Sequence, residues 1–346
     1  STPIKSSAAS DVYKRQLHGQ GLFSSFLGSY VSIGYFLFFF LFLIKAKEQQ
    51  IIKVLCILGI CWSIIELIQQ FTYPTYWFTT RGDEFSSGID IRNGIYRYNV
   101  IGREFGLVLL FYSFEKFMKN KKGKYLFGVL IGLIGIYLSV TRQVIAMSVI
   151  CLFAGLFLMK KISFKSLLLI GVVSLLVYVN ANTLFGEFIE MTEEVDEDYV
   201  RFWAYEFYGL TYNKGSILAF LLGNGSPYPP SRYFREIDNI EQSFGLWRAD
   251  IGIVGMYSQY GIIYVGIILW LFYYVFKQRK YIDTYLLMYV LFMAGTSIML
   301  HHFAYKLSIV IIGCFILYLI EQNINKNKKR LSNQNIHEVQ CNDTDL

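Results

Sequence analysis

Long apolar segments, separated by short charged stretches, occupy most of the chain. Nine of them approach the roughly 20 residues that a helix needs to cross the hydrocarbon core of a membrane. We expect membrane spans at about 22–44, 51–70, 99–118, 125–141, 143–159, 166–183, 251–275, 283–300 and 303–320. These segments lack the short alternating pattern of a membrane β-barrel, which leaves helices as the spanning elements. The predicted fold class is therefore an all-α polytopic integral membrane protein.

The composition agrees with this prediction. Hydrophobic residues make up 54% of the chain and aromatic residues 18%, whereas soluble domains contain about 45–50% apolar residues. A soluble helical protein with deeply buried helices is the less favoured alternative. Four of the five cysteines lie inside expected spans and none forms a CxxC pair, so the sequence predicts neither a disulfide nor a metal site.

Residues 1–16 do not read as natural protein sequence. The stretch from Ser6 to Gln16 is what the DNA of a transposon-end sequencing adaptor encodes in one reading frame. We interpret 1–16 as a translated adaptor and leave it out of the functional argument. Native sequence is then expected from Leu17 onward, and we expect the gene to be truncated at its 5′ end, with upstream helices missing.

Lysine-rich clusters set the expected orientation in the membrane. With nine spans, five clusters fall on one side, at 45–53, 119–124, 160–165, 277–280 and 326–330. The positive-inside rule makes that side cytoplasmic. The membrane domain then covers 17–322, with long outer loops at 71–98 and 184–250. The polar tail at 323–346 is expected to be cytoplasmic and disordered, and its basic cluster is a topological or lipid-contacting signal, not a nucleic-acid site.

Arginine, in contrast, is concentrated on the expected outer side. That side carries two lysines, Lys214 and Lys306, against nine arginines: Arg81, Arg92, Arg97, Arg103, Arg142, Arg201, Arg232, Arg235 and Arg248. The planar guanidinium binds phosphate or carboxylate through two parallel hydrogen bonds. We therefore expect several of these arginines to bind an anion. The alternative for each is a local ion pair with an acidic neighbour.

The segment "YLSVTRQVIAMSV", 137–149, places Arg142 between two apolar runs of about 17 residues. A helix of that length is about 26 Å long, slightly shorter than the hydrocarbon core of about 30 Å. Arg142 should therefore lie at the level of the outer headgroups.

Further ionisable residues fall near the outer ends of other expected spans. They are Glu66, Arg103, Glu104, Arg248, Asp250 and His301. Charged groups at this depth usually face a cavity or a partner. The pattern predicts one polar cavity open to the outer leaflet, and separate ion pairs, such as Arg103 with Glu66, are the alternative.

The larger outer loop contains an aromatic segment and a glycine turn. "YVRFWAYEFYGL", 199–210, includes Arg201 and Trp203, and its rings suit either the apolar faces of sugars or membrane headgroups. "LLGNGSPYPP", 221–230, predicts a turn around Asn224. No lysine-serine/threonine pair follows these glycines, so a nucleotide phosphate loop is not expected. The acidic run at 187–198 lacks a regular calcium-ligand pattern.

Four motifs follow one another along the chain between residues 139 and 255. They are "SVTRQ" at 139–143, Arg201-Phe202-Trp203, "LLGNG" at 221–225, and Asp250-x-Gly252-x-x-Gly255 within "RADIGIVGMYSQYGIIYVG". In this order they resemble the O-antigen polymerase and ligase superfamily, and within it the polymerases of surface-polysaccharide repeat units. The resemblance covers about 90–320. The family's arginine-x-x-x-tryptophan-like segment is here Arg201-x-Trp203, which departs in spacing.

The resemblance implies a glycosyltransferase with a GT-C-like helical architecture in the bacterial cytoplasmic membrane. It implies polymerisation of undecaprenyl-diphosphate-linked repeat units at the outer face, with the lipid diphosphate as leaving group. It implies neither a cofactor nor a metal. The expected partners are the lipid-linked glycans, membrane lipids, a flippase and a chain-length regulator, with no nucleic acid.

Ten residues are candidates for the site. The expected catalytic residues are Arg142, Arg201, Arg248 and Asp250, and the expected substrate-binding residues are Arg97, Arg103, Glu104, Trp203, Asn224 and His301. Arginines already in place at the leaving diphosphate would stabilise negative charge as it develops. The general base stays open among His301, Asp250 and Glu66.

Two other functions compete with polymerisation. A ligase would transfer finished glycan to another carrier, but ligases of the superfamily use a histidine in the large outer loop, and 184–250 contains none. A non-enzymatic polysaccharide transporter or flippase would favour polar residues near mid-membrane and internal repeats. The polar residues here gather at the outer ends of spans, and no repeat is evident.

Overall fold

The computed structural model describes residues 18, 20–73, 75, 91–92, 95–96, 100–159, 196–300, 302–303 and 306–343. This part of the chain is mostly α-helical. Four of its helices are long and apolar enough to cross a membrane, at Glu48–Thr72, Arg142–Met159, Arg248–Lys277 and Leu307–Arg330. Shorter apolar helices lie at Tyr30–Leu43, Gly123–Leu138 and Thr284–Thr296. The expected span at 166–183 falls outside the described residues, and the number of nine spans stays a prediction.

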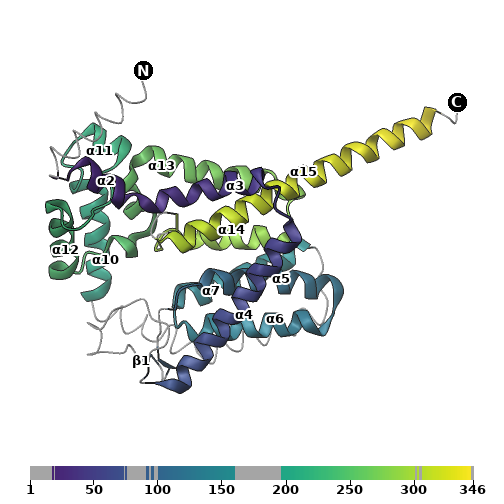
Figure 1. Cartoon of the computed structure of the whole chain (residues 1–346), viewed down its shortest axis with the longest axis horizontal. Helices are drawn as coiled ribbons and strands as arrows, with labels where there is room; N and C mark the ends of the chain where they lie inside the picture. The colour runs from purple at the N-terminus through teal and green to yellow at the C-terminus, as the bar shows by residue number, and fades with distance from the viewer. Residues whose placement is uncertain are drawn as a thin grey trace. The chain divides into compact units, whose positions relative to one another are not determined.

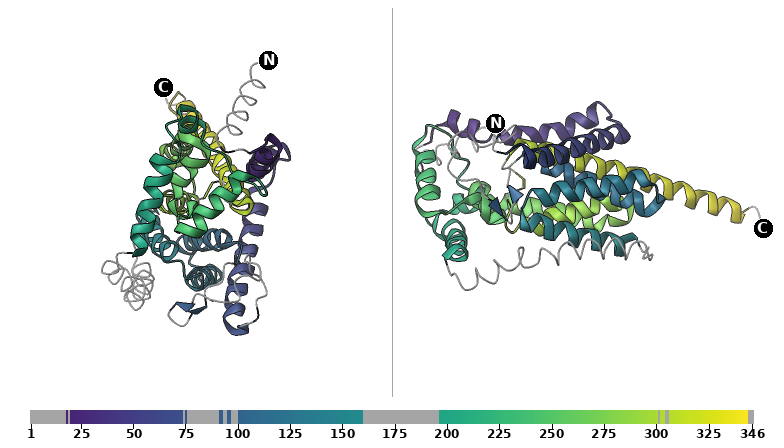
Figure 2. Two further views of the ribbon diagram at one scale, coloured as in Figure 1. Left: turned by 90° about the vertical axis from the view of Figure 1, so that its left-hand side faces the viewer. Right: turned by 90° about the horizontal axis from the view of Figure 1, so that it is seen from below.

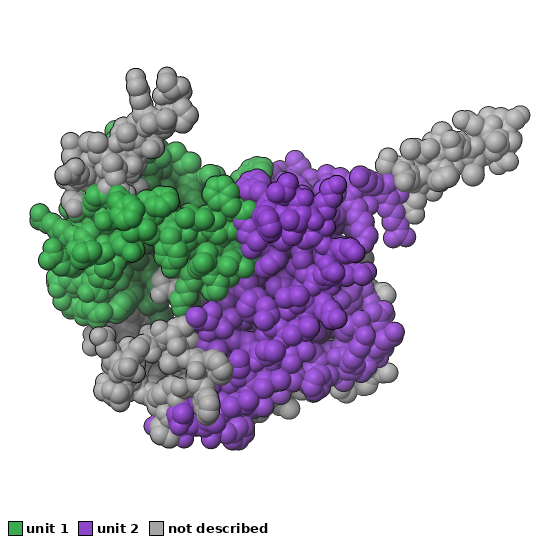
Figure 3. Space-filling view, viewed as in Figure 1, with its two compact units in different colours: residues 1–36, 177–272, 293–311 green, residues 37–176, 273–292, 312–346 purple. Residues whose placement is uncertain are grey.

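The chain divides into two compact units, and each is described by itself (Figure 3). Unit 1 comprises 1–36, 177–272 and 293–311. Unit 2 comprises 37–176, 273–292 and 312–346.

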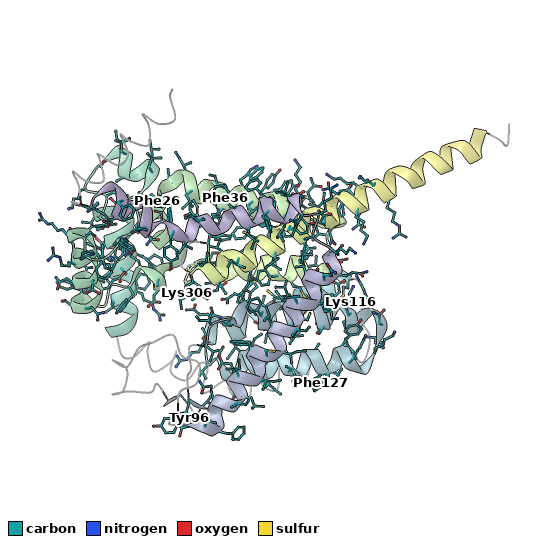
Figure 4. All side chains as sticks on the ribbon, viewed as in Figure 1. Phe26, Phe36, Tyr96, Lys116, Phe127 and Lys306 are labelled. Carbon is teal, nitrogen blue, oxygen red and sulfur yellow. The ribbon has the colours of Figure 1, made fainter. Side chains whose placement is uncertain are left out.

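Unit 2 is built around the helices α4 (Glu48–Thr72), α5 (Arg103–Asn120) and α6 (Gly123–Leu138), which pack against one another, with α7 (Arg142–Met159) beside α5 and α6 (Figure 1). Glycines permit close packing: Gly59 of α4 lies against the backbone of α5, and Gly106 of α5 lies against the Trp62 ring. The outward faces keep apolar side chains such as Phe127, which is exposed on α6 (Figure 4).

A short antiparallel hairpin precedes α5, with strands β1 (Ile91–Arg92) and β2 (Ile95–Tyr96). The Gln70 side chain of α4 accepts a hydrogen bond from the Tyr96 backbone nitrogen (3.1 Å) and donates one to the Tyr96 carbonyl (2.7 Å). The Tyr73 and Tyr96 rings stack with their centroids 4.1 Å apart, and Tyr96 is labelled in Figure 4. The hairpin is therefore attached to the end of α4.

The last helix, α15 (Leu307–Asp343), runs through most of the segment for which the sequence predicts a disordered polar tail. Side chains at the start of that segment hold it in unit 2. Asn323 donates to the Glu48 carboxylate (3.2 Å) and accepts from the Asp283 backbone nitrogen (3.1 Å). Asn327 donates to the Tyr281 carbonyl (2.7 Å) in the 3-10 turn η6 (Arg279–Tyr281).

The expected span at 22–44 is not one continuous helix. It consists of α2 (Leu22–Gly28), the 3-10 turn η1 (Tyr30–Tyr35) and α3 (Phe36–Leu43). The interruption falls at Gly28 and Ser29, residues that weaken a helix interior. Gly28 lies against the Ser226 carbonyl, so the break brings this segment onto the residues after Gly225. Phe26 and Phe36 remain exposed on either side of the interruption (Figure 4).

The described part of the large outer loop is helical. It contains α10 (Asp196–Glu206), the π-helical turn η4 (Phe207–Thr211), α11 (Ile217–Leu222), α12 (Arg232–Phe244) and the 3-10 turn η5 (Arg248–Ile251), followed by α13 (Gly252–Lys277) and α14 (Thr284–Thr296). Figures 1 and 2 show α10 and α12 close together. Their buried core comprises Ala204, Tyr208, Tyr212, Tyr233, Ile237, Leu246 and Ile251.

Helix α12 shows how the sequence sets these bounds. The Ser231 hydroxyl accepts a hydrogen bond from the Phe234 backbone nitrogen (3.0 Å), which caps the helix start. Gly245 follows the last residue in a left-handed conformation, which suits glycine and ends the helix. Tyr233 and Ile237, four residues apart, share the buried face.

Candidate functional site

The structure separates the predicted site residues into two sets. Arg201, Trp203, Asn224, Arg248 and Asp250 belong to unit 1. Arg103, Glu104 and Arg142 belong to unit 2. Arg97 and His301 lie outside the described residues, so their predicted roles have no geometry here.

Arg248 is the most deeply buried of the predicted arginines, with 7% of its surface exposed. Its Nε donates to the Glu241 Oε1 atom at 3.2 Å, and the same oxygen lies 3.4 Å from the Arg248 backbone nitrogen. Its guanidinium carbon lies 5.9 Å from the centroid of the Tyr208 ring. The Nη1 atom is buried and has no hydrogen-bond partner within the described residues. Glu241 therefore offsets the buried charge on one edge of the guanidinium and leaves a donor on the other.

The aspartate-glycine motif after Arg248 shapes the turn that holds it. Gly252 has a φ of 42°, and a methyl group there would overlap the Ser297 carbonyl oxygen, which accepts a hydrogen bond from the Ile253 nitrogen at 2.7 Å. Gly255 lies directly against the Arg248 carbonyl. Both glycines of Asp250-x-Gly252-x-x-Gly255 thus have a packing reason, and they fix the backbone that carries the guanidinium.

Three buried tyrosines surround this turn. Tyr208 donates to the Leu246 carbonyl and Tyr233 to the Gly225 carbonyl, each at 3.1 Å. The Tyr212 hydroxyl is buried and interacts with the Tyr233 phenol. Burial raises the pKa of Tyr212 and of Tyr233, which keeps both phenols protonated and able to donate.

His18 lies against two of these tyrosines, Tyr212 and Tyr233, and forms a buried polar network with Asn224. The His18 ring stacks on Tyr233 with centroids 4.4 Å apart. Its Nε2 lies 3.0 Å from Asn224 Oδ1, while Asn224 Nδ2 donates to the Ser258 carbonyl (3.0 Å) and to Asn213 Oδ1 (2.7 Å).

The Ser258 carbonyl determines the tautomer of His18. Because a backbone carbonyl can only accept, the amide nitrogen of Asn224 must face Ser258, and its oxygen must face the imidazole. The hydrogen of neutral His18 is then on Nε2, and Nδ1 keeps its lone pair. Nδ1 is buried and has no hydrogen-bond partner among the residues described. Burial lowers the pKa of His18, which favours this neutral form.

The other predicted residues of unit 1 lie at the surface. Arg201 is exposed on α10, which packs against η5, and Asp250 is exposed although Arg248, two residues earlier, is buried. Trp203 is half exposed, and its neighbour Phe202 is 72% exposed. The structure therefore brings the three motif segments of unit 1 together without burying Arg201 beside Arg248.

In unit 2, Arg103 forms its ion pair with Glu104, at 3.6 Å between Nη2 and Oε1. Among the described residues, Arg103 does not form the alternative ion pair with Glu66. Glu66 is 1% exposed, and its Oε2 has no hydrogen-bond partner within the described residues.

Arg142 is the first residue of α7 and is partly buried. It follows the turn that ends α6, in which Val140 has a φ of 47° and the Thr141 carbonyl accepts from the Val144 nitrogen at 2.9 Å. Arg142 therefore lies at the turn of a helical hairpin, where the sequence places it. The role of Arg142 in binding an anion stays a prediction.

His18 and the three tyrosines Tyr208, Tyr212 and Tyr233 are not among the residues that the sequence predicts for the site. Tyr208 and Tyr212 are four residues apart in a run of aromatic residues, which is a helical spacing. Nothing in the sequence joins His18 to Asn224, because the two are 206 residues apart and meet only through the fold.

Within the described residues, no three histidine, cysteine, aspartate or glutamate side chains lie together as metal ligands would. Compared with family models, with curated proteins and with solved structures, the chain matches none of them.

Proposed function

We propose that this protein is a membrane glycosyltransferase that polymerises glycan repeat units carried on undecaprenyl diphosphate, at the outer face of the bacterial cytoplasmic membrane. The observation that carries the proposal is Arg248. It is buried, oriented by Glu241, and held by the glycine motif through which the sequence resembles such polymerases. Its Nη1 donor has no hydrogen-bond partner among the described residues.

The chemistry needs a cationic donor at the departing diphosphate. The hydroxyl oxygen of the acceptor sugar attacks the anomeric carbon of the donor sugar, and the bond from that carbon to the phosphate oxygen breaks. Negative charge then grows on the lipid diphosphate. A guanidinium and neutral phenols held in place beforehand stabilise this charge without reorganising as the reaction proceeds. Arg248 and Tyr212 are suited to this role in unit 1. For Arg142, supported by Arg103, the role is the one that the sequence predicts.

The proton of the acceptor hydroxyl also needs a destination. The sequence leaves His301, Asp250 and Glu66 as possible bases. The geometry adds His18, because its Nδ1 carries the lone pair and its ring stacks on Tyr212 and Tyr233, which belong to the same core as Tyr208, the ring that Arg248 contacts. We propose His18 as the fourth candidate.

A reconstituted polymerisation assay tests the proposal. The protein in liposomes is given a synthetic undecaprenyl-diphosphate repeat unit, and chain length is followed by gel electrophoresis. Arg248→Lys retains a positive charge but loses the planar guanidinium with its paired N–H donors. We expect this variant to lower the rate of chain extension by about 100-fold, because that is the typical effect of removing one donor to a developing anion. Arg235→Ala, an exposed arginine of α12, is the matched control.

The product that the wild-type protein forms in this assay distinguishes a polymerase from a ligase and from a transporter. Extension of the lipid-linked repeat supports polymerisation. Transfer of a finished chain to a second carrier without extension would establish the ligase instead, and movement of the substrate across the bilayer without a new glycosidic bond would establish a transporter. If Arg248→Lys extends chains at the rate of Arg235→Ala, the assigned role of Arg248 is wrong.

A further inference from the structure

Helix α11 (Ile217–Leu222) exposes apolar side chains on most of its surface. Its sequence, "ILAFLL", contains no charged or polar residue. Ala219 alone is buried, while Ile217 is 75% exposed, Phe220 47% and Leu222 43%. A six-residue helix is too short to be stable alone in water, so its position must be supported by packing.

That packing is against the middle of α13, backbone to backbone. A methyl group on Gly223 would overlap the peptide between Gln259 and Tyr260, and a methyl group on Gly261 would overlap the peptide between Leu221 and Leu222. The two glycines thus allow the same close approach from opposite sides. Gly223 and Gly261 both have positive φ values, 72° and 78°.

Hydrogen bonds extend the contact beyond the glycines. The backbone nitrogens of Asn224 and Gly225 donate to the carbonyls of Ser258 (2.9 Å) and Gln259 (2.8 Å). These carbonyls are available because α13 departs from helical geometry at Gly261. The rings of Phe220 and Tyr257 also meet, with centroids 5.9 Å apart.

The contact lies well inside an expected membrane span. Tyr257 to Gly261 follow the start of α13 by five to nine residues, or roughly 8–14 Å along a helix axis. The next turns of α13 expose Ile262, Ile263 and Ile267, as expected of a surface that faces lipid. Irregular backbone is tolerated at this depth only where its polar groups bond to protein, as those of Asn224 and Gly225 do.

We propose that residues 217–222 form a membrane-embedded re-entrant helix whose exposed side chains contact lipid acyl chains. The sequence places this segment in an outer aqueous loop, where its side chains would form an exposed apolar patch of the kind that soluble surfaces avoid. The continuity of α11 with the exposed apolar surface of α13 favours lipid as the occupant.

Fluorescent labels at single cysteines test this proposal in the full chain, reconstituted in lipid nanodiscs. The five native cysteines are replaced, and Leu218→Cys and Leu222→Cys report on α11. Ile263→Cys on α13 is the lipid-facing reference, and Ser243→Cys, an exposed polar position on α12, is the aqueous reference. Each label is quenched in turn by lipids with brominated acyl chains and by aqueous iodide.

We expect the labels at 218 and 222 to behave like the label at 263, with strong quenching by brominated lipid and weak quenching by iodide. The label at 243 should show the reverse. Iodide quenching at 218 and 222 equal to that at 243 would overturn the proposal, because α11 would lie in water. Quenching by neither agent would also overturn it, because another protein segment or a second copy of the chain would cover α11. Since 218 and 222 are exposed, elution of each variant as a single size-exclusion peak is the folding check.

Discussion

Arg248 carries a charge that cannot be neutralised by deprotonation in a protein, and it is nevertheless buried. The Glu241 carboxylate, 3.2 Å from its Nε, is therefore required by the fold as well as useful to the site. A second ion pair on the same helix, Glu236 with Lys214 at 3.9 Å, is exposed. The two pairs differ in burial, so they should differ in their contribution to stability.

Replacing Glu241 by alanine leaves Arg248 buried without a counter-charge, which typically costs about 3–5 kcal/mol. Glu236→Ala breaks an exposed pair, which contributes at most about 1 kcal/mol. We expect Glu241→Ala to lower the melting temperature of the detergent-solubilised protein clearly and Glu236→Ala to change it little. Equal melting temperatures for the two variants would contradict the structural role of the Glu241 pair.

The protonation of His18 should make stability depend on pH. Burial lowers its pKa below the ordinary 6.5, with Asn224 and Glu236 acting against burial and Lys214 and Arg248 acting with it. In the window below pH 6.5 the unfolded chain binds a proton that the folded chain does not, so stability decreases as pH falls toward the folded pKa. We expect this loss in the wild type and a flatter profile in His18→Gln, measured as melting temperature from pH 8 to pH 5. Parallel profiles for the two proteins would contradict the assignment.

The proposed role of Arg142 can be tested in cells by the length of the glycan chains that they make. Under the proposed function, Arg142→Ala removes a guanidinium from the leaving diphosphate, and we expect long glycan chains to disappear while single repeat units stay attached. The amount of protein in the membrane should not change. Arg279→Ala, an exposed arginine on the expected cytoplasmic side, should keep long chains. Normal chain length in Arg142→Ala would remove Arg142 from the site.

At the scale of elements, the turn into α13 depends on Gly252. A side chain there meets both an unfavourable φ of 42° and the Ser297 carbonyl. We expect Gly252→Ala to cost about 1–3 kcal/mol and to lower the melting temperature. Gly266→Ala on the same helix is the control, because nothing lies within 4 Å of the added methyl group and alanine is the better helix former by about 1 kcal/mol. A melting temperature of Gly252→Ala equal to that of Gly266→Ala would show that the turn tolerates a side chain.

The sequence predicted well those helices that are long apolar runs between charged residues. The expected spans 51–70 and 143–159 correspond to α4 at Glu48–Thr72 and α7 at Arg142–Met159. The break in 22–44 and the non-helical Gly261 were not predictable, because each depends on contact with a distant segment. Arg248 was selected from its motif, yet its burial depends on Glu241, and the adjacency of His18 to Asn224 depends on the whole fold of unit 1.

At the scale of the whole molecule, the expected orientation can be measured directly. The lysine clusters predict that the turn between α5 and α6 is cytoplasmic and that α12 is outside. A membrane-impermeant maleimide added to spheroplasts should label Ser243→Cys and should label Lys121→Cys only after permeabilisation, in a background without the native cysteines. Both side chains are exposed, so burial does not explain a difference. Labelling of Lys121→Cys in intact spheroplasts would contradict the orientation.

The contact between Gly223 and Gly261 has a consequence for the evolution of the protein. Each glycine makes room for the backbone that carries the other, so a side chain at either position separates α11 from α13 and removes the reason for the second glycine. In relatives that keep this contact both positions should be glycine, and in lineages that lose it both should vary. The two positions should therefore covary as a pair, although they lie 38 positions apart in the chain.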